Sequence, residues 1–256
     1  MISNCHKMFA LQEYRYYIIC YIISAMTAHD LTKARAARNW TQSVAARRLG
    51  VSQAYLSMME KGKRRLTPSL ARKFMRAYGL DPTVLPPNDA WDGRKMDSHS
   101  LAAQLAALGY PGLRYLRPHV QKKNPTEVLL TALAQENLEA RLLEALPWLL
   151  VKYPEVNVEW LVSRAKLLEL QNRLGFVVSV ARGLSLRTDS PNKLRDRDLA
   201  VLESKLEHCA LAREDTLCQG SLTDAEVRWL RENRSREAAR WNLLTNWDLH
   251  HFRYAH

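Results

Sequence analysis

The chain has 256 residues, of which 47% are hydrophobic and 25% charged. This composition excludes a collagen-like or low-complexity protein and suffices for one large or two small globular domains. The net charge of +12 is uneven, because residues 1–95 contain 16 Lys and Arg against 6 Asp and Glu, whereas residues 96–256 contain 22 against 20. An excess of positive charge at one end of a chain is typical of a protein that binds an anionic polymer there.

Motifs that carry chemistry are scarce. Residues 96–256 contain no HExxH, GxSxG, GxGxxG or phosphate-loop sequence, so we expect no enzyme. Glu203 and Glu207 lie one turn apart on a predicted helix, but the basic residues around them favour a solvated face over a catalytic carboxylate pair. His208 lacks partners at zinc spacing, and the four cysteines form no CxxC pair: Cys5, Cys20, Cys209 and Cys218. We therefore expect reduced thiols in a cytoplasmic protein, with no metal and no cofactor.

Residues 1–26 are interpreted as an N-terminal extension. Within it, residues 16–26 form an apolar run of 11 residues that faintly resembles a signal peptide but is too short to span a bilayer. Three interpretations stay open. The extension lies upstream of a true start at Met26, or it is an extra helix or strand, or it is a targeting segment.

Two short helices joined by a tight turn follow this extension. Thr41 is an N-cap residue for a helix over residues 42–49, which Gly50 ends because glycine readily adopts the left-handed conformation. Ser52 then caps a second helix, over about residues 53–61. A gap this short forces a sharp crossing, which is the helix-turn-helix arrangement. Such a unit exposes one face of its second helix to a major groove.

This motif is the middle of a predicted five-helix domain over residues 27–88. One helix precedes the motif, over about residues 29–39. Pro68 stands at a favoured first position of the fourth helix, which Gly79 ends. Residues 81–85 are predicted as a short closing helix.

The stretch also contains an ordered set of residues: Thr41-Gln42, Ala46, Leu49-Gly50-Val51-Ser52-Gln53, Tyr55-Leu56-Ser57, Glu60, Gly62-Lys63-Arg64 and Pro68-Ser69-Leu70. With this set, residues 31–86 resemble the phage-repressor/Cro-type (XRE-like) helix-turn-helix domain of transcriptional regulators. Val44 departs from the family pattern, which has an acidic residue there, so no capping box forms. Ala45 also departs, since it replaces a common leucine. The resemblance implies double-stranded DNA as the partner.

The start of the second motif helix is expected to enter the major groove. The residues predicted to face base edges are Gln53, Ala54, Ser57 and Met58. Gln53 is the strongest of them, because its amide can pair with adenine N6 and N7 together. Phosphate contacts, which fix register without reading sequence, are predicted for Gln42, Tyr55, Lys61, Lys63 and Arg64. The resemblance suggests an intradomain role for Glu60, as the partner of a neighbouring arginine.

Composition marks residues 89–98 as a linker and residues 99–256 as an all-helical domain for dimerisation, effector or partner binding. Asn124 is a predicted N-cap, and Thr223 with Glu226 predicts a capping box. A basic loop precedes the first of these caps and contains Arg117, His119, Lys122 and Lys123.

One long, charged helix is predicted from Ser190 to Cys218. Three tryptophans are assigned to the core: Trp148, Trp160 and Trp229. Two more, Trp241 and Trp247, lie in an aromatic segment that docks back onto the body of the domain or meets a partner.

These features favour a sequence-specific DNA-binding transcriptional regulator that acts as a homodimer. A repressor is the expected type, while the sequence leaves repression and activation both open as the output. The alternative is an antitoxin-like autorepressor whose helical C-terminal domain binds and neutralises a partner protein. A third hypothesis is an enzyme with a DNA-binding targeting domain. No membrane association is expected.

Overall fold

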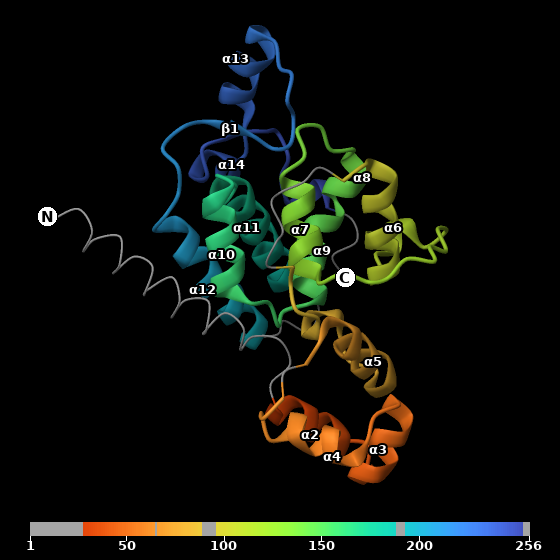
Figure 1. The fold of residues 1–256 in the computed structure, drawn as a ribbon. Coiled ribbons are helices and arrows are strands. Elements are labelled where there is room, and N and C mark those ends of the chain that lie inside the picture. The colour runs from red at the N-terminus through yellow and green to blue at the C-terminus, as the bar shows by residue number, and fades with distance from the viewer. Residues whose placement is uncertain (1–27, 65, 89–95, 188–192, 253–256) are drawn as a thin grey trace, which may run out of the picture. The chain divides into compact units, whose positions relative to one another are not determined.

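The computed structural model describes residues 28–64, 66–88, 96–187 and 193–252. Most of them lie in helices, which confirms the predicted all-α fold (Figure 1). In this part of the chain no helix combines the length and hydropathy needed to cross a bilayer. The predictions for residues 1–26, for most of the linker and for the start of the long helix at Ser190 lie outside the described residues.

The chain divides into two compact units, residues 1–87 (unit 1) and residues 88–256 (unit 2). The elements of unit 1 are α2 (Ala28–Ala36), α3 (Gln42–Leu49), α4 (Gln53–Glu60), α5 (Pro68–Tyr78) and the 3-10 turn η2 (Pro82–Val84). The predicted closing helix is thus a single 3-10 turn.

Side-chain caps begin three of the helices of unit 1, α3, α4 and α5. The hydroxyls of Thr41, Ser52 and Thr67 each accept a hydrogen bond from the backbone N–H three residues further on, at 3.1–3.3 Å. These caps satisfy N–H groups that have no partner inside the helix. Gly50 and Gly79 end α3 and α5 in the left-handed conformation, with φ of 66° and 53°. These helix boundaries could be predicted from the sequence, because each capping bond joins residues that are close together in the chain.

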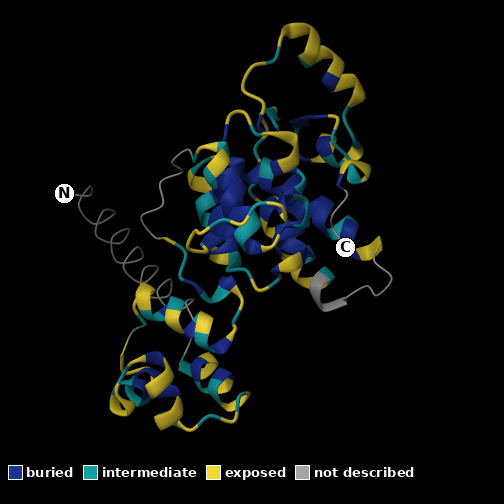
Figure 2. Ribbon diagram, turned by 90° about the vertical axis from the view of Figure 1, so that its right-hand side faces the viewer, coloured by how far each residue is buried: buried dark blue, intermediate teal, exposed yellow. Residues whose placement is uncertain are grey.

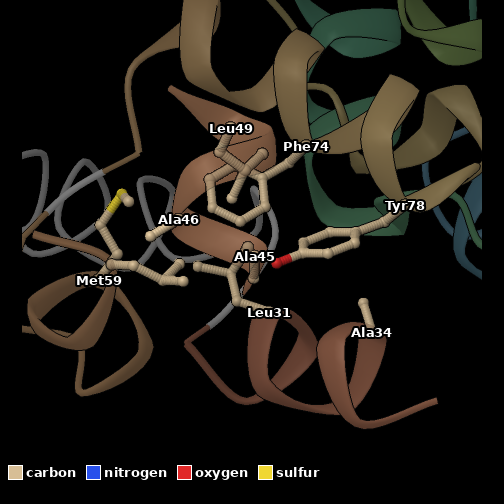
Figure 3. Close-up of a cluster of buried hydrophobic side chains, with 9 residues drawn as sticks. Leu31, Ala34, Ala45, Ala46, Leu49, Met59, Phe74 and Tyr78 are labelled. Atoms are coloured by element: carbon tan, nitrogen blue, oxygen red, sulfur yellow. The ribbon is translucent and has the colours of Figure 1, made fainter. Parts of the chain in front are cut away.

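The core of unit 1 gathers one or more apolar side chains from each of its α-helices (Figure 3). Its members are Leu31, Ala34, Ala45, Ala46, Leu49, Leu56, Met59, Phe74 and Tyr78. Burial raises the pKa of Tyr78 from its ordinary value to about 12. Trp40 covers this core, with its ring centroid 5.4 Å from that of Tyr78.

Unit 2 is built around one long central helix, α11 (Figure 1). Its elements are α6 (Ser98–Leu108), η3 (Pro111–Leu113), α7 (Pro125–Leu133), α8 (Ala140–Leu143), α9 (Ala145–Lys152), α10 (Val158–Leu167), α11 (Gln171–Arg187), α12 (Lys193–Glu207), β1 (Asp215–Thr216), α13 (Asp224–Asn233), α14 (Arg236–Arg240), β2 (Leu243–Leu244) and η4 (Leu249–His251). Helix α11 contacts α7, α9, α10, α12 and α14. The predicted N-cap Asn124 and the capping box of Thr223 with Glu226 are confirmed.

Helix α12 ends at Glu207 and does not reach Cys218, so the predicted long helix is wrong at its C-terminal end. Beyond the end of α12, the chain is held by the buried side-chain amide of Asn172. Asn172 Nδ2 donates to Leu211 O at 2.9 Å, and Leu211 N donates to Asn172 Oδ1 at 2.8 Å. Further on, Asp215 accepts two hydrogen bonds from Arg173 and starts β1, which pairs in parallel with β2. These tertiary bonds replace the helical ones.

The tryptophans divide between the core and the surface. Trp148 and Trp160 are buried, as predicted, and Trp241 docks into the core with 1% of its surface exposed. Trp229 is 51% exposed, so its assignment to the core is wrong. It lies on α13, which buries only Leu230 and is exposed along most of its length (Figure 2).

Glu203 lies on α12 and is only 3% exposed, so the prediction of a solvated face is wrong for this residue. Ser179 Oγ and Arg240 Nη1 donate to its Oε1 at 2.5 and 2.8 Å, and Arg182 Nη1 donates to its Oε2 at 3.0 Å. Trp241 Nε1 in turn donates to Ser179 Oγ at 2.7 Å. Three donors and two guanidinium charges compensate the buried carboxylate, which would otherwise destabilise the unit.

Replacing Gly175 tests the packing of Trp241. A Cβ at position 175 would lie 2.3 Å from two ring carbons of Trp241, and that ring is fixed by burial and by its hydrogen bond. Gly175→Ala should therefore lower the free energy of unfolding by about 1–3 kcal/mol, although alanine favours a helix over glycine by roughly 1 kcal/mol. Urea unfolding of the full chain, followed by tryptophan fluorescence, measures the change.

Gly183→Ala, in the same helix, is the matched control. Its Cβ would meet the methyl ends of Leu249 at 2.8 and 3.0 Å, and these can rotate away. The control variant should be clearly more stable than Gly175→Ala. Two variants of equal stability would show that the Trp241 ring does not limit the space at position 175.

Candidate nucleic-acid interface

The turn of three residues between α3 and α4 sets the angle at which they cross. Gly50 N donates to Arg47 O at 3.2 Å and Val51 N donates to Ala46 O at 3.0 Å, which closes the end of α3. Ser52 Oγ accepts from Tyr55 N at 3.1 Å and opens α4. One helix ends and the next begins within three residues, so the pair crosses sharply and leaves one side of α4 at the surface.

The structure gives each predicted base reader a definite environment on α4. Gln53 and Ala54 are exposed, while Ser57 and Met58 are partly buried. Leu56 and Met59, on the opposite side of the helix, are buried in the core. The outward side of α4 is therefore the side on which all four predicted readers lie.

Gln53 has a partner that the sequence analysis missed. Ser43 Oγ, on the first turn of α3, donates to Gln53 Oε1 at 3.0 Å. The bond holds the amide oxygen and leaves the amide N–H₂ group to donate. The two residues are ten apart in sequence, and only the crossing of α3 and α4 brings them together.

Glu60 joins the end of α4 to α2 and α3. Arg35 donates to it twice, from Nε at 2.6 Å and from Nη2 at 3.1 Å, which confirms the predicted pairing with an arginine. Gln42 Nε2 donates to the same carboxylate at 2.8 Å. The Glu60 side chain is 4% exposed and that of Arg35 17%. The hydrogen bond to Glu60 raises the pKa of Arg35 above its usual value.

Gln42, predicted as a phosphate ligand, is thus engaged inside the domain through its amide N–H₂ group. The other predicted phosphate ligands lie nearer the surface. Lys61, Lys63 and Arg64 are exposed in the segment after α4, and Tyr55 is partly buried against the core.

Further cations lie close to the motif. Lys73, on α5, was not predicted, but a Cβ at Gly50 would lie 3.8 Å from its Nζ, so its ammonium lies next to the turn. Arg48 stacks its guanidinium 4.3 Å from the ring centroid of Trp40. Residues 28–88 contain 12 Lys and Arg against three Asp and Glu, and Glu60 is already neutralised by Arg35. The domain that contains α4 therefore carries a large net positive charge.

Residues 31–85 match the family model described as helix-turn-helix. This segment is a helix-turn-helix domain, which is a DNA-binding domain of regulators. It is of the Cro/C1 (XRE) type, as the resemblance in the sequence indicated. The match covers about a fifth of the chain. Neither a curated protein nor a solved structure matches.

Removing the Glu60 carboxylate tests its role in holding α4. Glu60→Ala leaves Arg35 and Gln42 without their shared acceptor in a largely buried position, so it should lower the free energy of unfolding of unit 1 by about 2–3 kcal/mol. Gln42→Ala removes only one hydrogen bond and should cost about 1 kcal/mol. Urea unfolding followed by circular dichroism compares the two variants with the unaltered chain. The interpretation is wrong if Glu60→Ala proves no less stable than Gln42→Ala.

Proposed function

We propose that the protein is a sequence-specific transcriptional regulator that reads duplex DNA with α4. One observation carries this proposal. The solvent-facing side of α4 belongs to a helix-turn-helix domain with a large excess of cations, while the Glu60 carboxylate at the end of α4 is neutralised within the domain. Such a surface attracts the phosphate backbone and fits the major groove, which admits one α-helix.

In the proposed complex the N-terminal half of α4 lies in the major groove, and Gln53, Ala54, Ser57 and Met58 face base edges. Ala54 and Met58 offer apolar contact to a thymine methyl group. Gln53 reads adenine, because its N–H₂ group can donate to N7 while its oxygen accepts from the N6 amino group. The hydroxyl of Ser43 supports this assignment, since it holds the Gln53 oxygen in place and leaves that oxygen a second lone pair.

Phosphate contacts position the domain without reading sequence. We assign them to Gln42, Tyr55, Lys61, Lys63 and Arg64. Gln42 lies at the N-terminus of α3, where backbone N–H groups and the helix dipole favour an anion. Lys73, next to the turn, is a further candidate.

The regulator acts as a homodimer in this proposal. One helix-turn-helix reads only a few base pairs, which is too little for useful specificity on a genome. Two copies separated by about 34 Å reach successive major grooves on one face of the duplex, so their site is nearly palindromic. We assign to unit 2 the formation of the dimer or the binding of an effector or partner. Binding to chromosomal DNA places the protein in the cytoplasm, and repression is the simplest output of an occupied site.

Selection of bound duplexes from random DNA tests the function. The full chain should enrich one short motif arranged as two inverted half-sites about one helical turn apart. Sequencing of the recovered duplexes provides the measurement. Recovery of unrelated sequences would contradict sequence-specific binding, and recovery of a single half-site would contradict the dimer.

Replacing Gln53 tests base reading at the level of one residue. Gln53→Ala should lose about 1–3 kcal/mol of discrimination at one base pair and leave the preference at other positions unchanged. Ser43→Ala should weaken discrimination at the same base pair by a smaller amount, because it frees the Gln53 amide without removing it. Val44→Ala, on the same exposed turn of α3, is the control and should change nothing.

These variants are compared by titrating the selected duplex and its single-mismatch derivatives. A uniform loss of affinity on every duplex after Gln53→Ala would exclude Gln53 as a base reader.

A further inference from the structure

A strongly basic loop links η3 to α7 in unit 2. Residues 114–123 contain four Lys and Arg and no acidic residue. The loop projects from the surface of unit 2 beside α6 (Figure 1). Arg114, Arg117 and Lys122 are exposed, and Tyr115 is 63% exposed. This loop, which we call the basic loop, presents its cations to solvent.

The basic loop differs in charge from the rest of its unit. Residues 96–256 carry 22 Lys and Arg against 20 Asp and Glu. Without the four cations of the loop, the acidic residues of this segment outnumber the basic ones. The excess of positive charge in residues 96–256 thus comes from this one short stretch.

The backbone of the basic loop is fixed by a buried side chain. Gln104, on α6 and 7% exposed, donates from Nε2 to Gln121 O at 3.1 Å and accepts from Lys123 N at 3.2 Å. Leu113, at the start of the loop, is fully buried. Tyr115 is held through its hydroxyl, which accepts from Arg141 Nη1 at 3.0 Å. The cations therefore project from an anchored backbone.

The ion pairs of the basic loop leave most of its charge uncompensated. Lys123 pairs with Glu127 at 3.2 Å. Within the described part of the chain, Arg114, Arg117 and Lys122 have no carboxylate within 4.0 Å. Surface cations are usually tolerated alone, but three in one anchored loop form a local site of high positive potential.

We propose that the basic loop is a second DNA contact, which binds the phosphate backbone of the duplex that α4 reads. The inference rests on the proposed function, because unit 1 must first bring the duplex to the chain. Once unit 1 is bound, the same duplex is present at a high effective concentration for any site on unit 2.

Duplex DNA fits the basic loop better than an acidic protein does. DNA carries one charge per about 1.7 Å of helix axis, so irregularly spaced cations find phosphates without a matched pattern. A protein interface needs an apolar centre, and the loop offers only scattered apolar surface, chiefly Val120 at 40% exposure and the ring of Tyr115.

The test measures the salt dependence of binding by the full chain. The probe is a fluorescent duplex of about 40 base pairs that contains the site recovered by the selection, titrated between roughly 50 and 200 mM salt. The double variant Arg117→Ala/Lys122→Ala should lower the slope of log K against log salt by about 1.8, which is about 0.9 for each lost phosphate contact. Its affinity at the low-salt end should fall on the order of ten-fold.

Two control pairs accompany this variant. Lys152→Ala/Arg228→Ala removes the same charge from exposed positions elsewhere in unit 2 and should leave the slope unchanged. Arg117→Lys/Lys122→Arg keeps the charge of the loop and should bind as the unaltered chain does. A loop variant that behaves like the first control overturns the proposal.

A third pair separates this proposal from the function on which it rests. Lys63→Ala/Arg64→Ala, in unit 1, should also lower the slope. If only this pair has an effect, the basic loop is not a DNA contact and the regulator function stands. If the unaltered chain does not bind the duplex, both proposals fail. The loop variant Arg117→Ala/Lys122→Ala is also titrated with a single-stranded RNA of equal length. If this variant loses RNA binding and keeps its duplex binding, the DNA assignment is overturned.

Discussion

The carboxylate of Glu60 is the interaction on which the DNA-binding unit depends. Helices of eight residues are unstable alone, so α4 keeps its orientation only through tertiary contacts. Leu56 and Met59 hold its inner side by burial, which is not directional. The bonds from Arg35 and Gln42 to Glu60 add direction, since they tie the last residue of α4 to α2 and to the first residue of α3. The same bonds neutralise the negative charge closest to the outward face.

The two units differ in where they place their ionic groups relative to the apolar core. Unit 1 has a small core of aliphatic and aromatic side chains, to which Glu60 adds one ionic bond near the surface. Unit 2 is larger and places an ionic cluster inside, where Glu203 accepts from Ser179, Arg182 and Arg240. Such a cluster favours a unique packing, because any slip of α12 against α11 would leave a buried charge without partners.

The features that the sequence predicted correctly are those set by neighbours in the chain. The hydroxyls of Thr41 and Ser52 accept hydrogen bonds from backbone N–H groups three residues away. The family resemblance predicts the same helices. The errors concern distant partners. Glu203 is predicted on a solvated face from its basic neighbours in sequence. The prediction fails because the three residues that donate to it lie 21, 24 and 37 residues away. The partner Ser43 of Gln53 was missed for the same reason, since periodicity does not report which residues two crossing helices bring together. Trp229 is predicted in the core, but α13 buries only Leu230 and leaves Trp229 at the surface.

The docking of Trp241 has a consequence for the order in which the chain folds during synthesis. Its indole bonds to Ser179, 62 residues earlier, and its ring fills the space left at Gly175. At a translation rate of about 5–20 residues per second, α11 is made roughly 3–12 s before Trp241. Throughout that interval the apolar surface of α11 has no cover at this position, whereas the helix-turn-helix segment has already been synthesised. The ribosome thus carries a completed DNA-binding segment ahead of an unfinished core, and during this window the uncovered surface of unit 2 is exposed to aggregation and to capture by chaperones.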